Sequence, residues 1–250
     1  MRIGAQFYTI RDFCKDLGGF SESLKKVADI GYQYVQISGT CEYEPQWLAE
    51  QLKSNGLQCV LTHNPPAKLL EDARKVALDH DIFDCQYVGL GYHKFVAENC
   101  RELVDAFAEE YRPVARTLRE NGKYFMYHNH NFEFCSLEGR PVISHLAEIF
   151  APDEMGFTLD TYWVQRAGGD PAEWLERFAG RVPCIHLKDQ DFTGKMMVVG
   201  DGNINFRRVF QAAEKSGTEY MLVEQDECNG ENPFDCLKRS YDNLVSWGFQ

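Results

Sequence analysis

Aspartate, glutamate and histidine side chains stand at the ends of several short apolar segments of this 250-residue chain. Asp160 ends the run MGFTLD, His186 lies in VPCIHLKD, and Glu224 lies in EYMLVEQD. A carboxylate buried among such apolar neighbours is costly unless it is paired or bound to a cation. Two carboxylates and one imidazole suit Mn²⁺, Mg²⁺, Co²⁺ or Zn²⁺. The pattern therefore predicts a divalent metal site that contains Asp160, His186 and Glu224.

Two other apolar segments end in histidines. One closes with Thr62-His63-Asn64, and another runs through His128-Asn129-His130 into Asn131-Phe132-Glu133. A single residue of this kind is more often a helix cap, a salt-bridge partner or a hydrogen-bonded core residue. Several of them at the ends of successive strands of one sheet favour a functional site.

Eight apolar runs alternate with amphipathic segments, and these elements must position the polar residues. The runs cover residues 2–9, 32–38, 57–63, 85–92, 124–130, 155–163, 182–189 and 219–226. They are short and rich in Val, Ile, Tyr and Phe, which is typical of parallel strands buried on both faces. Segments near 24–31, 103–111, 143–150, 206–213 and 237–245 have helical spacing of their apolar residues. Asp170-Pro171 and Asn232-Pro233 predict helix starts, and Gly31, Gly56, Gly122 and Gly217 predict helix ends.

Eight strand–helix units in about 250 residues predict a (β/α)8 TIM barrel, with residues 1–250 forming a single domain. An open Rossmann sheet is disfavoured because the first strand is followed by GAQFYTIRD rather than a glycine-rich phosphate loop. In a barrel the carboxyl ends of all strands meet at one face. The polar strand ends would therefore converge there.

Composition excludes several classes of protein. The formal net charge is −12, with 26 basic and 38 acidic residues, which argues against a nucleic-acid partner. The nine cysteines are scattered and form no Cys-x-x-Cys pair, so we expect neither a disulfide scaffold nor a structural zinc site. We find no signal segment or membrane span and expect a cytoplasmic protein. Whether it forms a homo-oligomer stays open.

The chain resembles the xylose-isomerase-like TIM-barrel superfamily, the sugar phosphate isomerase/epimerase group. The resemblance covers essentially the whole length, through GAQFYTIRD, GYQYVQISG, YHNHNFEF, LDTYW, HLKD, GDGNINF and VEQD. It implies one divalent metal ion, with Mn²⁺ as the first choice. The ligands would be a carboxylate from the fifth strand (124–130), the aspartate Asp160, the histidine His186 and the glutamate Glu224.

The fifth strand departs from the commoner pattern of the family. Many relatives have Glu-Asn-His where this chain has His128-Asn129-His130. Either His128 is the ligand, or Glu133 reaches back to the metal. We favour Glu133, because a second carboxylate helps to offset the charge of the cation, and we then expect His128 to bind substrate. Strand alternation directs His128 and Glu133 to opposite faces, so Glu133 can reach the metal only if the strand bulges or ends by Phe132.

The resemblance also implies an activity: an isomerase or epimerase that moves a proton next to the carbonyl of a sugar or keto-sugar through an enediolate. His130 is our candidate base, and Glu133 and Glu224 are alternatives from the metal's surroundings. Lys188 would donate to the developing oxyanion, or would instead form a salt bridge with Asp189 or Asp160. The expected substrate-binding residues are His63, His128, Tyr8 and Trp163.

Three alternatives remain. One is a metal-dependent lyase or dehydratase that eliminates water or an aglycone from a 3-keto-sugar or keto-inositol. Another is an abasic-site endonuclease, which the charge and the single-ion ligand set oppose. The last is an inactive barrel with a binding role. Gly200-Asp201-Gly202 could bind a phosphate at a helix start, but Asp201 would repel it, so we expect an unphosphorylated substrate.

Overall fold

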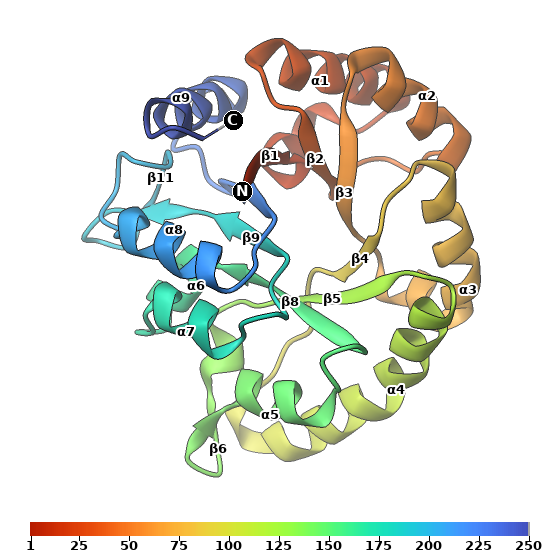
Figure 1. Ribbon diagram of the computed structural model, residues 1–250, viewed down its shortest axis with the longest axis vertical. Coiled ribbons are helices and arrows are strands. Elements are labelled where there is room, and N and C mark those ends of the chain that lie inside the picture. The colour runs from red at the N-terminus through yellow and green to blue at the C-terminus, as the bar shows by residue number, and fades with distance from the viewer. Residues whose placement is uncertain (250) are drawn as a thin grey trace.

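Eight parallel strands close into a barrel with the helices around it, as the computed structural model of residues 1–249 shows (Figure 1). The strands are β1 (Arg2–Gln6), β2 (Tyr34–Ile37), β3 (Gln58–His63), β4 (Tyr87–Leu90), β5 (Tyr124–His128), β8 (Met155–Asp160), β9 (Cys184–Leu187) and β12 (Tyr220–Val223). Their order around the barrel is β1–β12–β9–β8–β5–β4–β3–β2, so the first strand pairs with the last. Each strand lies within one of the eight expected runs. The predicted (β/α)8 TIM barrel is confirmed.

The helices follow the strands in chain order. They are α1 (Leu17–Ile30), α2 (Pro45–Asn55), α3 (Pro66–Ile82), α4 (Cys100–Glu120), α5 (Val142–Ile149), α6 (Thr161–Arg166), α7 (Pro171–Arg177), α8 (Phe206–Lys215) and α9 (Pro233–Ser246). Short 3₁₀ helices cover Phe7–Phe13 (η1), Ala97–Asn99 (η2) and Phe132–Phe134 (η3), and two small hairpins pair β6 (Ser136–Leu137) with β7 (Arg140–Pro141) and β10 (Asp189–Gln190) with β11 (Met196–Met197). Within residues 1–249 no helix combines the length and apolar character that a membrane span needs.

Local signals in the sequence explain where the helices begin and end. The carboxylate of Asp170 accepts a hydrogen bond from the amide of Ala172 at the start of α7, and the side chain of Asn232 does the same for Phe234 in α9. Gly31 and Gly56 end α1 and α2 with positive φ angles of 123° and 65°. A side chain would be strained at either position, so glycine stops these helices at the expected residues.

The barrel has two apolar layers. The larger layer lies between strands and helices, and Phe125 of β5, for example, stacks on Tyr111 of α4 there. The smaller layer fills the interior of the barrel and contains Val60, Leu61, Tyr87, Met126, Cys184, Tyr220 and Leu222. Strand residues alternate between these two layers. The residue two positions after an interior residue therefore also faces the barrel axis. At the carboxyl ends those residues are polar.

Candidate functional site

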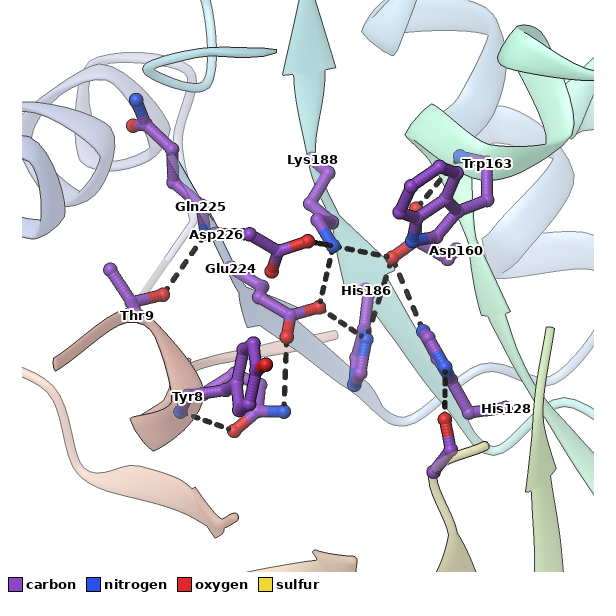
Figure 2. Close-up of polar contacts among 12 residues, drawn as sticks. Tyr8, Thr9, His128, Asp160, Trp163, His186, Lys188, Glu224, Gln225 and Asp226 are labelled. Carbon is purple, nitrogen blue, oxygen red and sulfur yellow. Dashed lines mark hydrogen bonds and ion pairs between the residues drawn. The ribbon is translucent and has the colours of Figure 1, made fainter. Parts of the chain in front are cut away.

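Four buried side chains meet inside the barrel at the carboxyl ends of four neighbouring strands. His128 ends β5, Asp160 ends β8, His186 lies in β9, and Glu224 follows β12. One ligand atom from each of them lies within 4.8 Å of the ligand atoms of the other three. We refer to His128, Asp160, His186 and Glu224 as the ligand cluster. Figure 2 shows them converging from their separate strands.

Distances within the ligand cluster fit a metal ion. Nδ1 of His186 lies 2.9 Å from Oε2 of Glu224 and 3.6 Å from Oδ2 of Asp160, and Nε2 of His128 lies 3.3 Å from the same Asp160 oxygen. The ligands of a tetrahedral ion bound at about 2.1 Å are about 3.4 Å apart. Two imidazole nitrogens and two carboxylate oxygens also suit Mn²⁺, Co²⁺ or Zn²⁺.

Each imidazole of the cluster is held by a hydrogen bond on its far side. Nδ1 of His128 donates to the carbonyl oxygen of Gly91 at 3.2 Å, and Nε2 of His186 donates to Oε1 of Gln36 at 2.7 Å. These bonds place one proton on the far side of each ring, so Nε2 of His128 turns a lone pair inward, and Nδ1 of His186 does so once its own proton is lost. Partners of this kind fix the tautomer of metal-binding histidines.

The two carboxylates are oriented in the same way. Oδ1 of Asp160 accepts the backbone amide of Trp163 at 3.0 Å, because Asp160 also begins helix α6. Oε1 of Glu224 accepts from Nε2 of Gln6 on β1 at 3.2 Å. One oxygen of each carboxylate is thus used for orientation, and the other, Oδ2 of Asp160 or Oε2 of Glu224, faces the cluster.

The geometry of the contact between His186 and Glu224 shows whether these two side chains are better described as a hydrogen-bonded ion pair or as two ligands of a metal ion. Nδ1 of His186 and Oε2 of Glu224 are only 2.9 Å apart, yet neither atom has a partner in hydrogen-bond geometry among residues 1–249. Buried polar atoms are normally satisfied. Two such atoms, in an ion-pair contact that lacks hydrogen-bond geometry, are arranged as two ligands of a common ion are. The residues present therefore fit a metal ion.

Lys188 adds a fixed positive charge to the cluster. Its Nζ lies 3.4 Å from Oδ2 of Asp160, 3.2 Å from Oε2 of Glu224 and 2.7 Å from Oδ2 of Asp226. Figure 2 shows the ammonium group between these carboxylates. Burial alone would lower the pKa of Lys188, but the three carboxylates outweigh burial and hold the pKa above its ordinary value. Lys188 is therefore charged, and it forms the Asp160 salt bridge rather than the Asp189 one.

The pKa values of the Asp160 and Glu224 carboxyl groups are shifted in the opposite direction. Burial would raise the pKa of Asp160 and of Glu224, but Lys188 and the neighbouring imidazoles lower both below the ordinary range. Burial would lower the pKa of His186, whereas Glu224 and Asp160 raise it to about 9. The cluster therefore holds two ionised carboxylates at neutral pH, and this negative charge attracts a cation.

Glu133 lies outside the ligand cluster, in contrast to the expected role. The strand β5 ends at His128, and Glu133 stands in the 3₁₀ helix η3. Its carboxylate accepts from the hydroxyl of Tyr127 at 2.5 Å and from the backbone amide of His130 at 2.7 Å. Tyr127 points away from the barrel axis, with its ring against Phe107 of α4. Glu133 therefore packs on the outer side of β5, and His128 supplies the fifth-strand member of the cluster.

His63 lies beside the ligand cluster at the end of β3. Its ring centroid is 5.3 Å from that of His128 and 5.7 Å from that of His186, and its buried Nε2 has no partner in the described chain. A Cβ atom at Gly91 would come within 2.5 Å of Nδ1 of His63. Glycine after β4 thus makes room for this imidazole, whose free nitrogen faces the same interior.

His130, Trp163 and Tyr8 are the other expected site residues at the mouth. The ring of His130 lies 4.7 Å from that of His128 and 5.2 Å from that of Trp163. Burial, with His128 adding to it, lowers the pKa of His130 to about 3, so its imidazole is neutral. Tyr8 follows β1 on the opposite side, with the Arg11 guanidinium 4.4 Å from the centre of its ring.

The glycine-rich segment after β9 is already engaged by a side chain. Oδ2 of Asp189 accepts the amides of Gly200 and Gly202, each at 2.9 Å, and Oδ1 accepts the amide of Ile204 at 3.1 Å. These amides are the groups that a phosphate would have needed. The segment therefore anchors a loop to the barrel.

Three residues of the site were missed by sequence reasoning. Gln6 and Gln36 orient two members of the cluster, and Asp226 holds Lys188. A lone glutamine inside a buried strand is the signal that could have found the first two, because a buried amide needs a partner. Asp226 stands in VEQD, two residues beyond a predicted ligand.

Comparisons with known proteins found a family model and several curated relatives. A family model described as a xylose isomerase-like TIM barrel matches residues 24–240. An inosose dehydratase from Lacticaseibacillus casei is 28% identical over 138 aligned positions, and the alignment covers 47% of this chain and 45% of that relative, so the match spans about half the length of the relative. An inosose dehydratase from Mesomycoplasma hyopneumoniae is 22% identical over 280 aligned residues, covering 94% of this chain and 93% of its own.

A solved structure supports the fold independently. The crystal structure of a sugar phosphate isomerase/epimerase from Parabacteroides distasonis superposes with a TM-score of 0.83 over 99% of this chain and 94% of that chain. The two sequences are 20% identical. At this identity the likeness concerns the path of the backbone.

Proposed function

The chain belongs to the xylose isomerase-like TIM barrel family, and on that premise we propose that it is a divalent-metal-dependent isomerase or epimerase of a small keto-sugar. The observation that carries the proposal is the ligand cluster, in which four buried side chains point one ligand atom each at a common centre. Fold membership alone does not assign a reaction, because one barrel supports many chemistries. The residues at the strand ends support the proposed one.

We assign the metal-holding role to His128, Asp160, His186 and Glu224, with Mn²⁺ as the first ion to test. A divalent cation held there would polarise a substrate carbonyl and so acidify the neighbouring C–H bond. Gln6, Gln36 and the Gly91 carbonyl keep the ligand atoms in place before any ion binds. Preorganisation of this kind is what lets charge that develops in the transition state be stabilised without rearrangement.

His130 is the proposed base. Its neutral ring stands directly beside His128, and its buried Nδ1 has no partner within residues 1–249. A nitrogen in this position can accept a proton from the carbon next to the carbonyl and return it to the neighbouring carbon, as isomerisation requires. Epimerisation needs a second group that donates a proton to the opposite face, and we propose Glu224 for that role. Glu133, which we had expected to share this task, is proposed instead to hold the His130 backbone amide.

Lys188 is proposed to stabilise the oxygen on which negative charge develops. Its ammonium group is buried against Asp160 and Glu224 and is fixed by Asp226. A charged donor in such a water-poor place stabilises an oxyanion more than it would in solvent. His63 and Trp163, with unpartnered buried nitrogens in the described chain, are proposed to bind substrate hydroxyl groups, and Tyr8 to line the opposite rim.

We propose that the sugar is unphosphorylated. The amides of Gly200 and Gly202 are used by Asp189, and the charge of Lys188 is balanced by carboxylates. These groups therefore supply no free anion site beside the cluster. An uncharged polyol fits this surrounding better.

A second candidate function is elimination, in which the abstracted proton leads to loss of water or an aglycone from a 3-keto-sugar or keto-inositol. The two curated relatives named above are both inosose dehydratases, and this favours the lyase. Both reactions begin with removal of the same kind of proton. They differ in whether a group departs afterwards.

Incubation of the Mn²⁺-loaded protein with keto-sugars in D₂O tests the proposal. Deuterium in the recovered sugar or in its isomer supports the isomerase, and loss of water or of an aglycone supports the lyase. The Asp160→Asn variant is the matched control, because it preserves the shape of the ligand and removes its charge. Should the wild-type protein show neither exchange nor elimination, or should Asp160→Asn retain full activity, the proposal is overturned.

A further inference from the structure

One side of the mouth of the barrel is a continuous surface of rings. Tyr92 follows β4, His130 and Phe132 follow β5, and Trp163 follows β8, and these three strands are neighbours in the barrel. We refer to these four residues as the aromatic wall. Because they stand at adjacent carboxyl strand ends, the wall rises directly from the ligand cluster.

Ring distances show that the wall is unbroken from the cluster to solvent. The ring of His130 lies 4.7 Å from that of His128 and stacks on Phe132 at 5.0 Å with an interplanar angle of 11°. Tyr92 lies 5.5 Å from both His130 and Phe132 in edge contacts. The wall ends in solvent at Tyr92, which is 53% exposed.

The inner end of the wall is polar. Nδ1 of His130 and Nε1 of Trp163 are buried and have no hydrogen-bond partner in the part of the chain that the structure describes. Buried nitrogens of this kind normally have a hydrogen-bond partner, so we expect a polar group of a ligand to bond them. Farther out, Phe132 offers only an apolar ring, and the exposed ring of Tyr92 continues that surface.

The other side of the mouth has the opposite character. Lys188 and Asp226 form a salt bridge of 2.7 Å after β9 and β12, and Nη2 of Arg11 donates to the Asp226 carbonyl at 3.1 Å. The mouth is thus charged over β9, β12 and β1 and aromatic over β4, β5 and β8. A ligand that fits both sides is itself amphipathic.

We propose that the aromatic wall binds an apolar aryl or alkyl substituent of the substrate, so that the substrate is a keto-glycoside with an apolar aglycone rather than a free sugar. The inference rests on the proposed function, because the sugar part is placed by the ligand cluster. The apolar face of one sugar ring would cover one aromatic side chain. The wall extends past His130 to two further rings, and this extension is where the substituent lies.

The test compares two keto-sugar probes, a phenyl and a methyl 3-keto-glucoside, by calorimetric binding and by deuterium exchange with the Mn²⁺-loaded protein. We expect the wild-type protein to bind the phenyl probe about tenfold more tightly, which is the scale of one buried aromatic contact. Tyr92→Ala should remove most of this preference and leave the affinity for the methyl probe within about twofold. Tyr92→Phe keeps the ring and should keep the preference.

Leu78→Ala is the matched control, because Leu78 is similarly exposed (49%) but lies on α3, outside the wall. The inference is overturned if the wild-type protein does not distinguish the probes, or if Tyr92→Ala weakens both equally. Its failure is distinct from that of the proposed function. Absence of deuterium exchange with both probes would overturn the proposed function, whereas equal exchange and equal binding would leave that function standing and remove the subsite.

Discussion

His128 occupies the place where a carboxylate would give the ligand cluster a third negative charge. With an imidazole there and His186 neutral as a metal ligand, Asp160 and Glu224 contribute two negative charges, and the charges of Lys188 and Asp226 offset each other. A divalent cation would balance the two remaining negative charges, those of Asp160 and Glu224. The choice of histidine is therefore consistent with a site in which a lysine, rather than a third carboxylate ligand, tunes the local field.

Metal content separates the two candidate residues of β5. We expect His128→Ala to lose most of the bound Mn²⁺, because it removes one of four ligands, and Glu133→Gln to keep about one ion per chain, because its carboxylate bonds Tyr127 and His130 instead. Elemental analysis after dialysis measures both. Full occupancy in His128→Ala together with loss in Glu133→Gln would reverse the assignment.

The buried carboxyl group of Glu133 makes stability depend on pH. Burial raises the pKa of Glu133 to about 8, from the ordinary 4.5 that it regains on unfolding. Between these values the folded chain holds a proton that the unfolded chain releases, so the free energy of unfolding decreases as pH rises. The decrease is at most about 1.4 kcal/mol per pH unit.

Glu133→Gln should remove this dependence, because an amide carries no such proton and can still bond Tyr127 and the His130 amide. In urea denaturation with EDTA present, we expect the stability of the variant relative to the wild-type protein to increase by about 2 kcal/mol between pH 5.5 and pH 7.5. Parallel pH profiles of the two proteins would contradict the prediction.

At the scale of elements, the loop between β9 and α8 depends on one carboxylate. Asp189 accepts the amides of Gln190, Gly200, Gly202 and Ile204, and so ties residues 190–204 to the end of β9. The neighbouring Lys188 belongs to the site. Asp189, which holds the loop, and Lys188, which supplies the positive charge of the site, are therefore adjacent residues at the end of β9.

Asp189→Asn should destabilise the protein by about 2 kcal/mol, because the amide nitrogen turns a donor toward backbone donors. Protease cleavage within residues 191–203 should become faster at the same time. Asp191→Asn is the control: this exposed aspartate accepts amides at the tip of the hairpin, and we expect a loss of about 1 kcal/mol or less. Equal losses in the two variants would count against the anchor.

The site could be predicted where side chains follow strand ends, and less well where the chain leaves the strand. Asp160, His186 and Glu224 were identified because each interrupts an apolar run, and their strands are neighbours in the barrel. Glu133 was expected in the interior because a second carboxylate would offset the charge of a cation, although strand alternation directs its side chain to the opposite face. The direction of a side chain after a strand depends on the turn that follows, here the 3₁₀ helix η3, and no pattern in HNHNFEF specifies that turn.

At the scale of the whole molecule, the barrel could be predicted because eight buried strands leave a strong periodic signal. The hairpins β6–β7 and β10–β11 could not, because two-residue strands have no period to recognise. The apolar layer inside the barrel could not be predicted either. Residues such as Met126 and Leu222 lie in apolar runs that are buried on both faces, and the sequence does not show which face becomes the interior.

Metal binding should stabilise the whole barrel, because the ligands come from β5, β8, β9 and β12. Addition of Mn²⁺ at 100 times its dissociation constant to EDTA-treated protein should contribute about 2.7 kcal/mol, or a rise in Tm of about 5 to 10 °C. Differential scanning calorimetry measures the rise. The Asp160→Asn variant should not respond, and an equal rise in that variant would place the ion elsewhere.

The pairing of the first strand with the last has a consequence for how the protein is made. Gln6 donates to Glu224, and the amide of Gln225 donates to Thr9, so these contacts form only after the residues that follow β12 have been synthesised. A ribosome delivers the amino end long before β12. Three of the four proposed ligands therefore precede β12 along the growing chain, and Glu224 joins them only after β12 has paired with β1 and β9.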